Sequence, residues 1–143
     1  MTRDEILSME AGRELDALVA TEVMGWAKCV PGTGWLLDEE WKKLGEGEVF
    51  WYNSLGLISA ANKNGYRMWR PSYDIAAAMQ VLDTFDRREW DIAITSYTED
   101  EGEIWGCELH HYSEKEHLGW YAASDASLPK AISITALLAK MQP

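Results

Sequence analysis

Three stretches between residues 90 and 123 have the periodicity of β-strands, and this pattern constrains the fold most. They span residues 90–97, 103–112 and 119–123, and two short acidic segments with turn-forming residues separate them. Alternation in the middle stretch predicts one face with Trp105, Cys107, Leu109 and His111, and an opposite face with Glu108, His110 and Tyr112. We therefore expect an antiparallel meander in which Cys107 is a small core residue.

Two segments that precede the strands carry helix signals. The first begins with a capping box, in which Thr2 and Glu5 satisfy backbone N–H groups, and it keeps helical spacing up to Gly25. The second begins after Pro71, with Ser72 as its N-cap. Its expected buried stripe consists of Ile75, Ala78, Met79, Leu82 and Phe85.

A third helix is predicted from near Ser127 to Met141, with Pro129 in its first turn. This segment is apolar around most of its circumference. Such a helix is either buried between layers of its own chain or shared with another subunit. We therefore also expect a homo-oligomer.

Residues 26–70 form the irregular part of the chain. Residues 31–34 (PGTG) and 45–47 (GEG) are loop signals, residues 49–53 (VFWYN) are typical of a short strand, and residues 62–65 (NKNG) indicate a hairpin-like turn. Irregular segments of this length usually serve a function.

Composition excludes several classes of protein. The length of 143 residues fits one domain, and no apolar stretch is long enough to cross a membrane. A formal charge of −11 argues against binding to nucleic-acid polymers, which requires many Lys and Arg side chains. Two cysteines that lie far apart, Cys29 and Cys107, fit a reducing compartment. We expect a cytoplasmic protein with no membrane association.

Three motifs resemble one known family. They are MEAGRELDALV at residues 9–19, followed by VMGW at 23–26; PSYDIAAA at residues 71–78; and ASLPKAI at residues 126–132, followed by LLA at 137–139. In this order they resemble the phage ABA sandwich domain family, a group of small phage and prophage proteins, over nearly the whole chain.

The resemblance implies an α/β fold with a three-layer α-β-α sandwich on a mainly antiparallel sheet. The implied order of elements is α, an irregular or β segment, α, β, β, β, α, within a single domain over residues 1–143. The resemblance also implies a phage or prophage origin and the cytosol of a bacterial host. It implies no activity, since the family is largely uncharacterised.

The candidate catalytic and metal-binding patterns in the sequence are each better explained by a structural role. Cys107 and His110 have the spacing of a zinc motif, but strand alternation points them to opposite faces. Cys107 and His111 share a face that is expected to be buried, where a thiolate nucleophile is disfavoured. The paired carboxylates lie in solvated turns, and residues 31–34 lack the ending of a phosphate-binding loop. We expect no enzyme activity, no metal and no cofactor.

One basic and aromatic segment, residues 49–73, stands out from the acidic chain. Its 25 residues contain no Asp or Glu and carry a formal charge of +3. Cations bind phosphate and aromatic rings stack on bases, while N–H groups at a helix start bind anions. The predicted ligand-binding residues are Lys63, Tyr66, Arg67, Trp69, Arg70, Ser72 and Tyr73.

These sequence features suggest two alternative functions. In the first, a phage protein without catalytic activity sequesters a small anionic, nucleotide-derived immune signal and so counters host defence. In the second, exposed Trp side chains and the acidic surface bind a host protein and inhibit or retarget it. A purely structural interpretation of residues 49–73, with aromatic side chains packed inward, also stands.

Overall fold

The computed structural model describes residues 1–25, 27–29, 49–53, 56–61, 69–114 and 116–141. The chain divides into two compact units, one formed by Met1–Met24 with Arg70–Pro143 and the other by Gly25–Trp69. Each unit is described by itself. The single domain expected over residues 1–143 stays a prediction.

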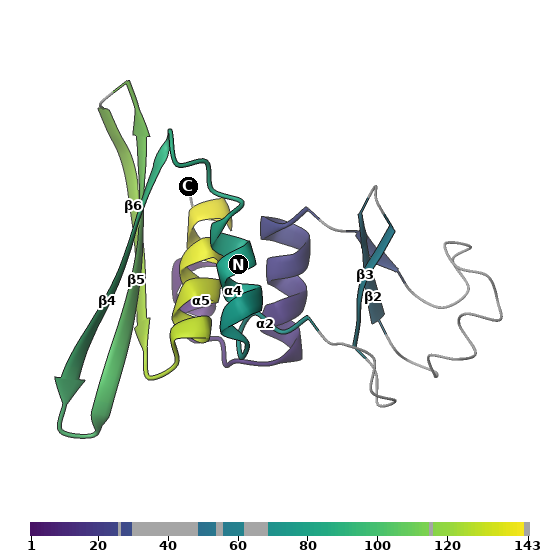
Figure 1. Ribbon diagram of the computed structural model, residues 1–143, viewed down its shortest axis with the longest axis horizontal. Coiled ribbons are helices and arrows are strands. Elements are labelled where there is room, and N and C mark those ends of the chain that lie inside the picture. The colour runs from purple at the N-terminus through teal and green to yellow at the C-terminus, as the bar shows by residue number, and fades with distance from the viewer. Residues whose placement is uncertain (26, 30–48, 54–55, 62–68, 115, 142–143) are drawn as a thin grey trace. The chain divides into compact units, whose positions relative to one another are not determined.

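The larger unit contains the predicted antiparallel meander (Figure 1). Strand β4 (Trp90–Glu99) pairs with β5 (Gly102–Ser113), which pairs in turn with β6 (Glu116–Asp125). The strands are longer than the sequence pattern predicts, because backbone pairing continues to Glu99 and Gly102 and leaves only two residues in the first turn. Gly102 has a φ of 124°, a backbone conformation that suits glycine at this tight reversal.

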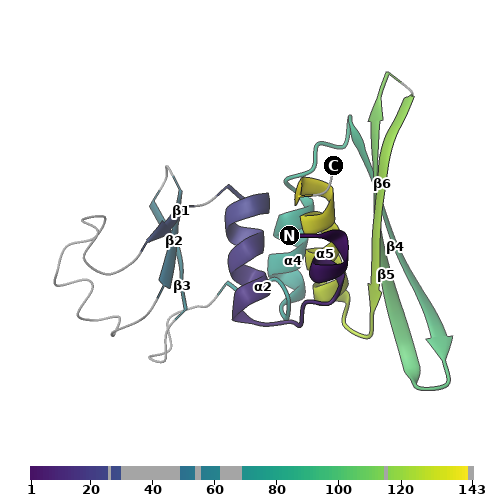
Figure 2. The same cartoon turned by 180° about the vertical axis from the view of Figure 1, so that it is seen from behind.

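Helices pack on one face of this sheet. Cys107 and Leu109 on this face are fully buried, as the alternation predicts. Burial raises the pKa of the Cys107 thiol to about 11, so the thiol stays protonated. In Figures 1 and 2 the helices of this unit all lie on the same side of the sheet. The larger unit is therefore an α/β arrangement of a sheet with one face covered by the described helices.

The N-terminal segment forms two helical pieces rather than the single helix that was expected. Helix α1 (Arg3–Leu7) has the predicted capping box of Thr2 and Glu5. Helix α2 (Arg13–Leu18) follows a break and continues into the π-helix η1 (Val19–Val23). The helix is interrupted before α2 because its N-cap, Gly12, has a φ of 154°, which is incompatible with a continuous helix.

Helix α4 (Ile75–Leu82) begins later than the sequence predicts. Its N-cap is Asp74, whose carboxylate accepts a hydrogen bond from the Ala76 N–H, so the prediction of Ser72 as N-cap is wrong. Residues 70–74 instead form a turn closed by the Arg70 carbonyl. The buried face is also shifted, since Ile75 and Met79 are 46% and 40% exposed. The buried residues are Ala77, Ala78, Val81, Leu82 and Phe85.

Helix α5 (Leu128–Met141) was expected either to be buried within its own chain or to be shared with another subunit. Every residue from Ala131 to Ala139 is buried. The helix contacts β5 and β6 on one side, and α4, η1, α1 and α2 elsewhere around its circumference. It is thus buried between layers of its own chain. A second subunit is not needed to cover it, and the homo-oligomer stays a prediction.

The smaller unit contains a second antiparallel sheet with the order β1-β2-β3. Its strands are β1 (Ala27–Cys29), β2 (Val49–Asn53) and β3 (Gly56–Ala61). Strand β2 coincides with the predicted short strand at residues 49–53. The expected loops at 31–34 and 45–47 and the turn at 62–65 lie outside the described residues.

The shifted face of α4 can be tested with two truncations on this helix. Leu82→Ala removes a fully buried side chain and should lower the free energy of unfolding by about 2–5 kcal/mol. Met79→Ala changes a side chain that is 40% exposed and should cost less than about 1 kcal/mol. Urea unfolding measures both values. Equal losses of unfolding free energy in the two variants would contradict the observed buried face and favour the face that the sequence pattern predicts.

Candidate functional site

The structure describes four of the seven predicted ligand-binding residues. Lys63, Tyr66 and Arg67 lie outside the described residues. Trp69 belongs to the smaller unit and is partly buried. Arg70, Ser72 and Tyr73 belong to the larger unit, where their geometry is as follows.

Arg70 and Tyr73 come together on the surface. The guanidinium carbon of Arg70 lies 5.9 Å from the centroid of the Tyr73 ring, which is a cation–π contact. The Tyr73 side chain is 58% exposed, and its hydroxyl donates a hydrogen bond of 2.9 Å to the Ala11 carbonyl. A cation and a flat ring are therefore adjacent and open to solvent at this position.

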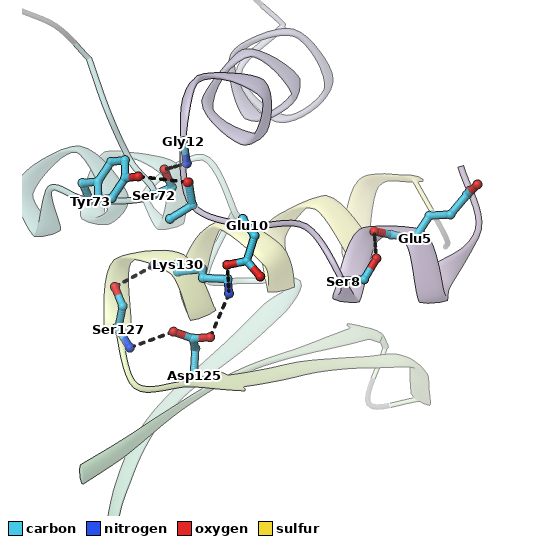
Figure 3. A network of polar contacts seen from close by, with 10 residues as sticks. Glu5, Ser8, Glu10, Gly12, Ser72, Tyr73, Asp125, Ser127 and Lys130 are labelled. Atoms are coloured by element: carbon cyan, nitrogen blue, oxygen red, sulfur yellow. Dashed lines mark hydrogen bonds and ion pairs between the residues drawn. The ribbon is translucent and has the colours of Figure 1, made fainter. Parts of the chain in front are cut away.

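Ser72 has an internal role. Its N–H donates to Oδ1 of Asp16 over 2.8 Å, and its hydroxyl accepts from the Gly12 N–H over 3.0 Å, the second of these contacts being drawn in Figure 3. The residue is fully buried. It joins the turn before α4 to the start of α2, and its side chain has no exposed surface to offer a ligand. The nearby helix start already holds the carboxylate of Asp74.

Asp16 is the buried charged group behind this turn. Burial raises the pKa of its carboxyl above the ordinary Asp value, while hydrogen bonds from Ser72 and the charge of Arg70 oppose that rise. The positive charge of Arg70 therefore helps to stabilise the ionised form of the Asp16 carboxyl.

A second polar network lies where the N-terminal segment meets α5 (Figure 3). Nζ of Lys130 lies 3.0 Å from Oδ2 of Asp125 and 3.4 Å from Oε2 of Glu10. Burial lowers the pKa of Lys130, but the hydrogen bonds and charges of these two carboxylates outweigh it, so the pKa lies above its ordinary value. An open hollow of about 520 Å³ adjoins Glu10 and is also lined by Glu5 and Glu14. Its three carboxylates disfavour an anion.

The sheet face turned away from the helices, here called the open face, gathers aromatic and titratable side chains. Register places on it Tyr97, Glu108, His110, Tyr112, His117 and Trp120. Trp120 is 59% exposed and Tyr97 is 49% exposed. The indole Nε1 of Trp120 donates to Oε1 of Glu108 over 3.2 Å, which fixes the ring across β5 and β6.

A β-bulge brings His117 to the open face. His111 pairs with Gly119, but the next residue, Tyr112, pairs with His117, so Leu118 is the extra residue on β6. In a regular ladder Leu118 would occupy the position opposite Tyr112, and His117 would point to the helix-covered face. With the bulge, Nε2 of His117 lies 3.3 Å from Nδ1 of His110.

Sequence reasoning found part of this arrangement. Alternation correctly assigned Glu108, His110 and Tyr112 to the face opposite Cys107. It placed His117 in a turn, because β6 was expected to begin at Gly119. The only local signal for the longer strand is the apolar Leu118 next to His117, and this signal does not reveal a bulge.

The described part of the chain contains neither a metal-ligand cluster nor a membrane-spanning helix. No group of three or more His, Cys, Asp or Glu side chains is arranged to hold a metal ion there. In the same ranges, no helix combines the length and apolar character needed to cross a bilayer.

Substitutions of Asp16 separate its hydrogen bond from its charge. Asp16→Ala leaves the buried Ser72 N–H without this acceptor and should cost about 1–3 kcal/mol of unfolding free energy. Asp16→Asn keeps an acceptor oxygen and should cost less. Chemical denaturation at pH 7 compares the two variants with the parent protein.

The same pair predicts a pH dependence. Because the pKa of Asp16 is raised in the folded state, its contribution to stability is greatest below the unfolded pKa and declines as pH rises through the folded pKa. Asp16→Asn removes this titration. The stability of the parent relative to Asp16→Asn should therefore fall as pH rises from the ordinary Asp value, and a constant difference across the acidic range would contradict the raised pKa.

Comparison with known proteins identifies the family. Residues 17–137 match the family described as the phage ABA sandwich domain, and this match covers most of the chain. No curated protein and no solved structure matches the chain. The match confirms the family that the motifs indicate, and it includes the motifs at residues 23–26, 71–78 and 126–132. The chain belongs to the phage ABA sandwich domain family.

Proposed function

We propose that this phage-family protein is a binding module without catalytic activity that docks a protein partner on the open face of its sheet. The observation that carries the proposal is the exposure of Trp120 and Tyr97, at 59% and 49%, on a face that the described helices leave uncovered. Large aromatic side chains are enriched among the residues that dominate binding energy at protein interfaces.

Trp120 is held in place before any partner binds. Its hydrogen bond to Glu108 restrains the indole, and its ring centroid lies 6.2 Å from that of His110 in a stacked arrangement. A restrained aromatic side chain loses little conformational entropy on binding. It is therefore suited to act as the central anchor of an interface.

The charges around the open face select the partner. Glu108 and Asp91 lie on this face, and the β4–β5 turn adds Asp100 and Glu101 at one end of the sheet. With a formal charge of −11 on the whole chain, this surface favours a partner that has an apolar centre and a basic rim. A host protein in the bacterial cytosol is the expected partner, which the phage protein would inhibit or retarget.

The proposed absence of catalysis is supported by the buried and protonated thiol of Cys107. Cys107 is buried on the helix-covered face and its thiol stays protonated. Its carbonyl oxygen accepts a hydrogen bond from the Thr135 hydroxyl in α5. This cysteine therefore serves as part of the core rather than as a nucleophile.

Trp120→Ala tests the docking face. A partner is first recovered from host lysate, then purified, and its affinity for the phage protein is measured by calorimetry. Trp120→Ala should weaken binding by at least 2 kcal/mol, about 30-fold, if Trp120 is the anchor. Tyr73→Ala removes an equally exposed aromatic side chain outside the sheet and is the matched control. Equal affinity of the Trp120 variant and the parent would refute docking on this face.

A second candidate function is sequestration of a small anionic, nucleotide-derived immune signal. It is favoured by one specific observation, the guanidinium of Arg70 over the exposed ring of Tyr73, which can bind a phosphate and stack on a base respectively. Of the predicted ligand-binding residues, the proposal rests on these two side chains of the larger unit. Ser72 would contribute only by holding the turn.

Thermal unfolding with a panel of linear and cyclic nucleotides tests sequestration. A ligand at 100 times its Kd should stabilise the folded state by about 2.7 kcal/mol and raise Tm by several degrees. Arg70→Ala should abolish this shift, whereas Arg88→Ala, which removes another exposed cation, should preserve it. No rise in Tm with any nucleotide would exclude this function for the compounds tested.

A further inference from the structure

We infer that His110 and His117 on the open face form a binding site for a divalent transition-metal ion of the Zn²⁺ type. This inference concerns the isolated chain and is independent of the proposed protein partner. It rests on the 3.3 Å separation between Nδ1 of His110 and Nε2 of His117. These two ring nitrogens face one another across neighbouring strands.

The separation is the one that a tetrahedral ion requires. Zn²⁺ binds imidazole nitrogen at about 2.0–2.1 Å, so two such ligands at the tetrahedral angle lie about 3.3–3.4 Å apart. The nitrogens of His110 and His117 already have this spacing. An ion would replace the hydrogen bond that the two rings share at this distance, without any change in the separation of the two nitrogens.

The bulge at Leu118 creates this arrangement. It turns His117 to the open face and sets it directly opposite Tyr112, two residues along β5 from His110, which pairs with Trp120 on the same face. Bulges commonly redirect a side chain at a functional site. Both histidines are anchored on paired strands, which lowers the entropy cost of bringing two ligands to one ion.

The far side of the His110 ring favours the required tautomer. Nε2 of His110 lies 4.0 Å from Oε2 of Glu108, while the other oxygen of this carboxylate is bound by the indole of Trp120. A carboxylate near Nε2 favours the proton on that nitrogen, so the lone pair of Nδ1 accepts the hydrogen bond from His117 without metal and can bind a metal ion in its place. Glu108 thus acts as a positioning residue for His110.

The remaining coordination positions would face solvent. The described residues provide no cluster of three or more ligands, so water is expected to complete the coordination sphere. Cys107 lies on the covered face and stays outside this site, in contrast to the Cys-x-x-His pattern of the sequence. The negative charge of the chain favours a cation on this surface.

Calorimetric titration of the full chain, free of any histidine tag, with ZnCl₂ tests the site. We expect one ion per chain, and His110→Ala and His117→Ala should each weaken binding about tenfold or more. His111→Gln is the matched control, because this third histidine stacks on Trp90 at the covered face. Melting temperatures confirm that each variant is folded.

Long-range ¹H–¹⁵N NMR of the imidazole rings identifies the nitrogens that bind. Addition of Zn²⁺ should shift Nδ1 of His110 and Nε2 of His117, and leave both nitrogens of His111 unchanged. MgCl₂, which prefers oxygen ligands, should shift none of them. A histidine pair that binds no Zn²⁺ overturns the inference, as does Zn²⁺ binding that survives in the His110→Ala, His117→Ala double variant.

Discussion

Burial of α5 against the sheet is the interaction on which the larger unit depends. All nine residues from Ala131 to Ala139 are buried, including two hydroxyl side chains. Ser133 donates to the Pro129 carbonyl, and the hydroxyl of Thr135 lies within hydrogen-bond distance of the carbonyls of Ala131 and Cys107. Because these polar groups are satisfied, the helix can be enclosed without loss of stability. Its enclosure commits one sheet face to the core, and the described helices leave the other face uncovered.

Two polar networks fix how the remaining segments meet this core. Asp16, Ser72 and Gly12 join the turn before α4 to the start of α2. Lys130, with Asp125 and Glu10, joins the start of α5 to the end of β6 and to the N-terminal segment. Both networks connect residues that are distant in sequence. They explain why Ser72, within a segment that suggests ligand binding, serves the fold.

The open face places an aromatic anchor, a carboxylate and two imidazoles next to one another. A restrained, exposed Trp120 and a close pair of imidazoles share one carboxylate, Glu108, which accepts from the indole and faces His110. The proposed docking and the proposed metal binding would use different atoms of this face. They can therefore occur separately, or a bound ion can lie next to a docked partner.

Local periodicity determined the meander, the buried positions of Cys107 and Leu109, and the outward position of His110, since alternation along a strand needs no information beyond the strand. The family motifs added the α/β class. Tertiary structure alone decided where α4 begins, because buried contacts of Ser72 with Asp16 and Gly12 displaced the N-cap to Asp74. It also decided that His117 meets His110, because the bulge at Leu118 depends on how two strands pair, and no single strand encodes that pairing.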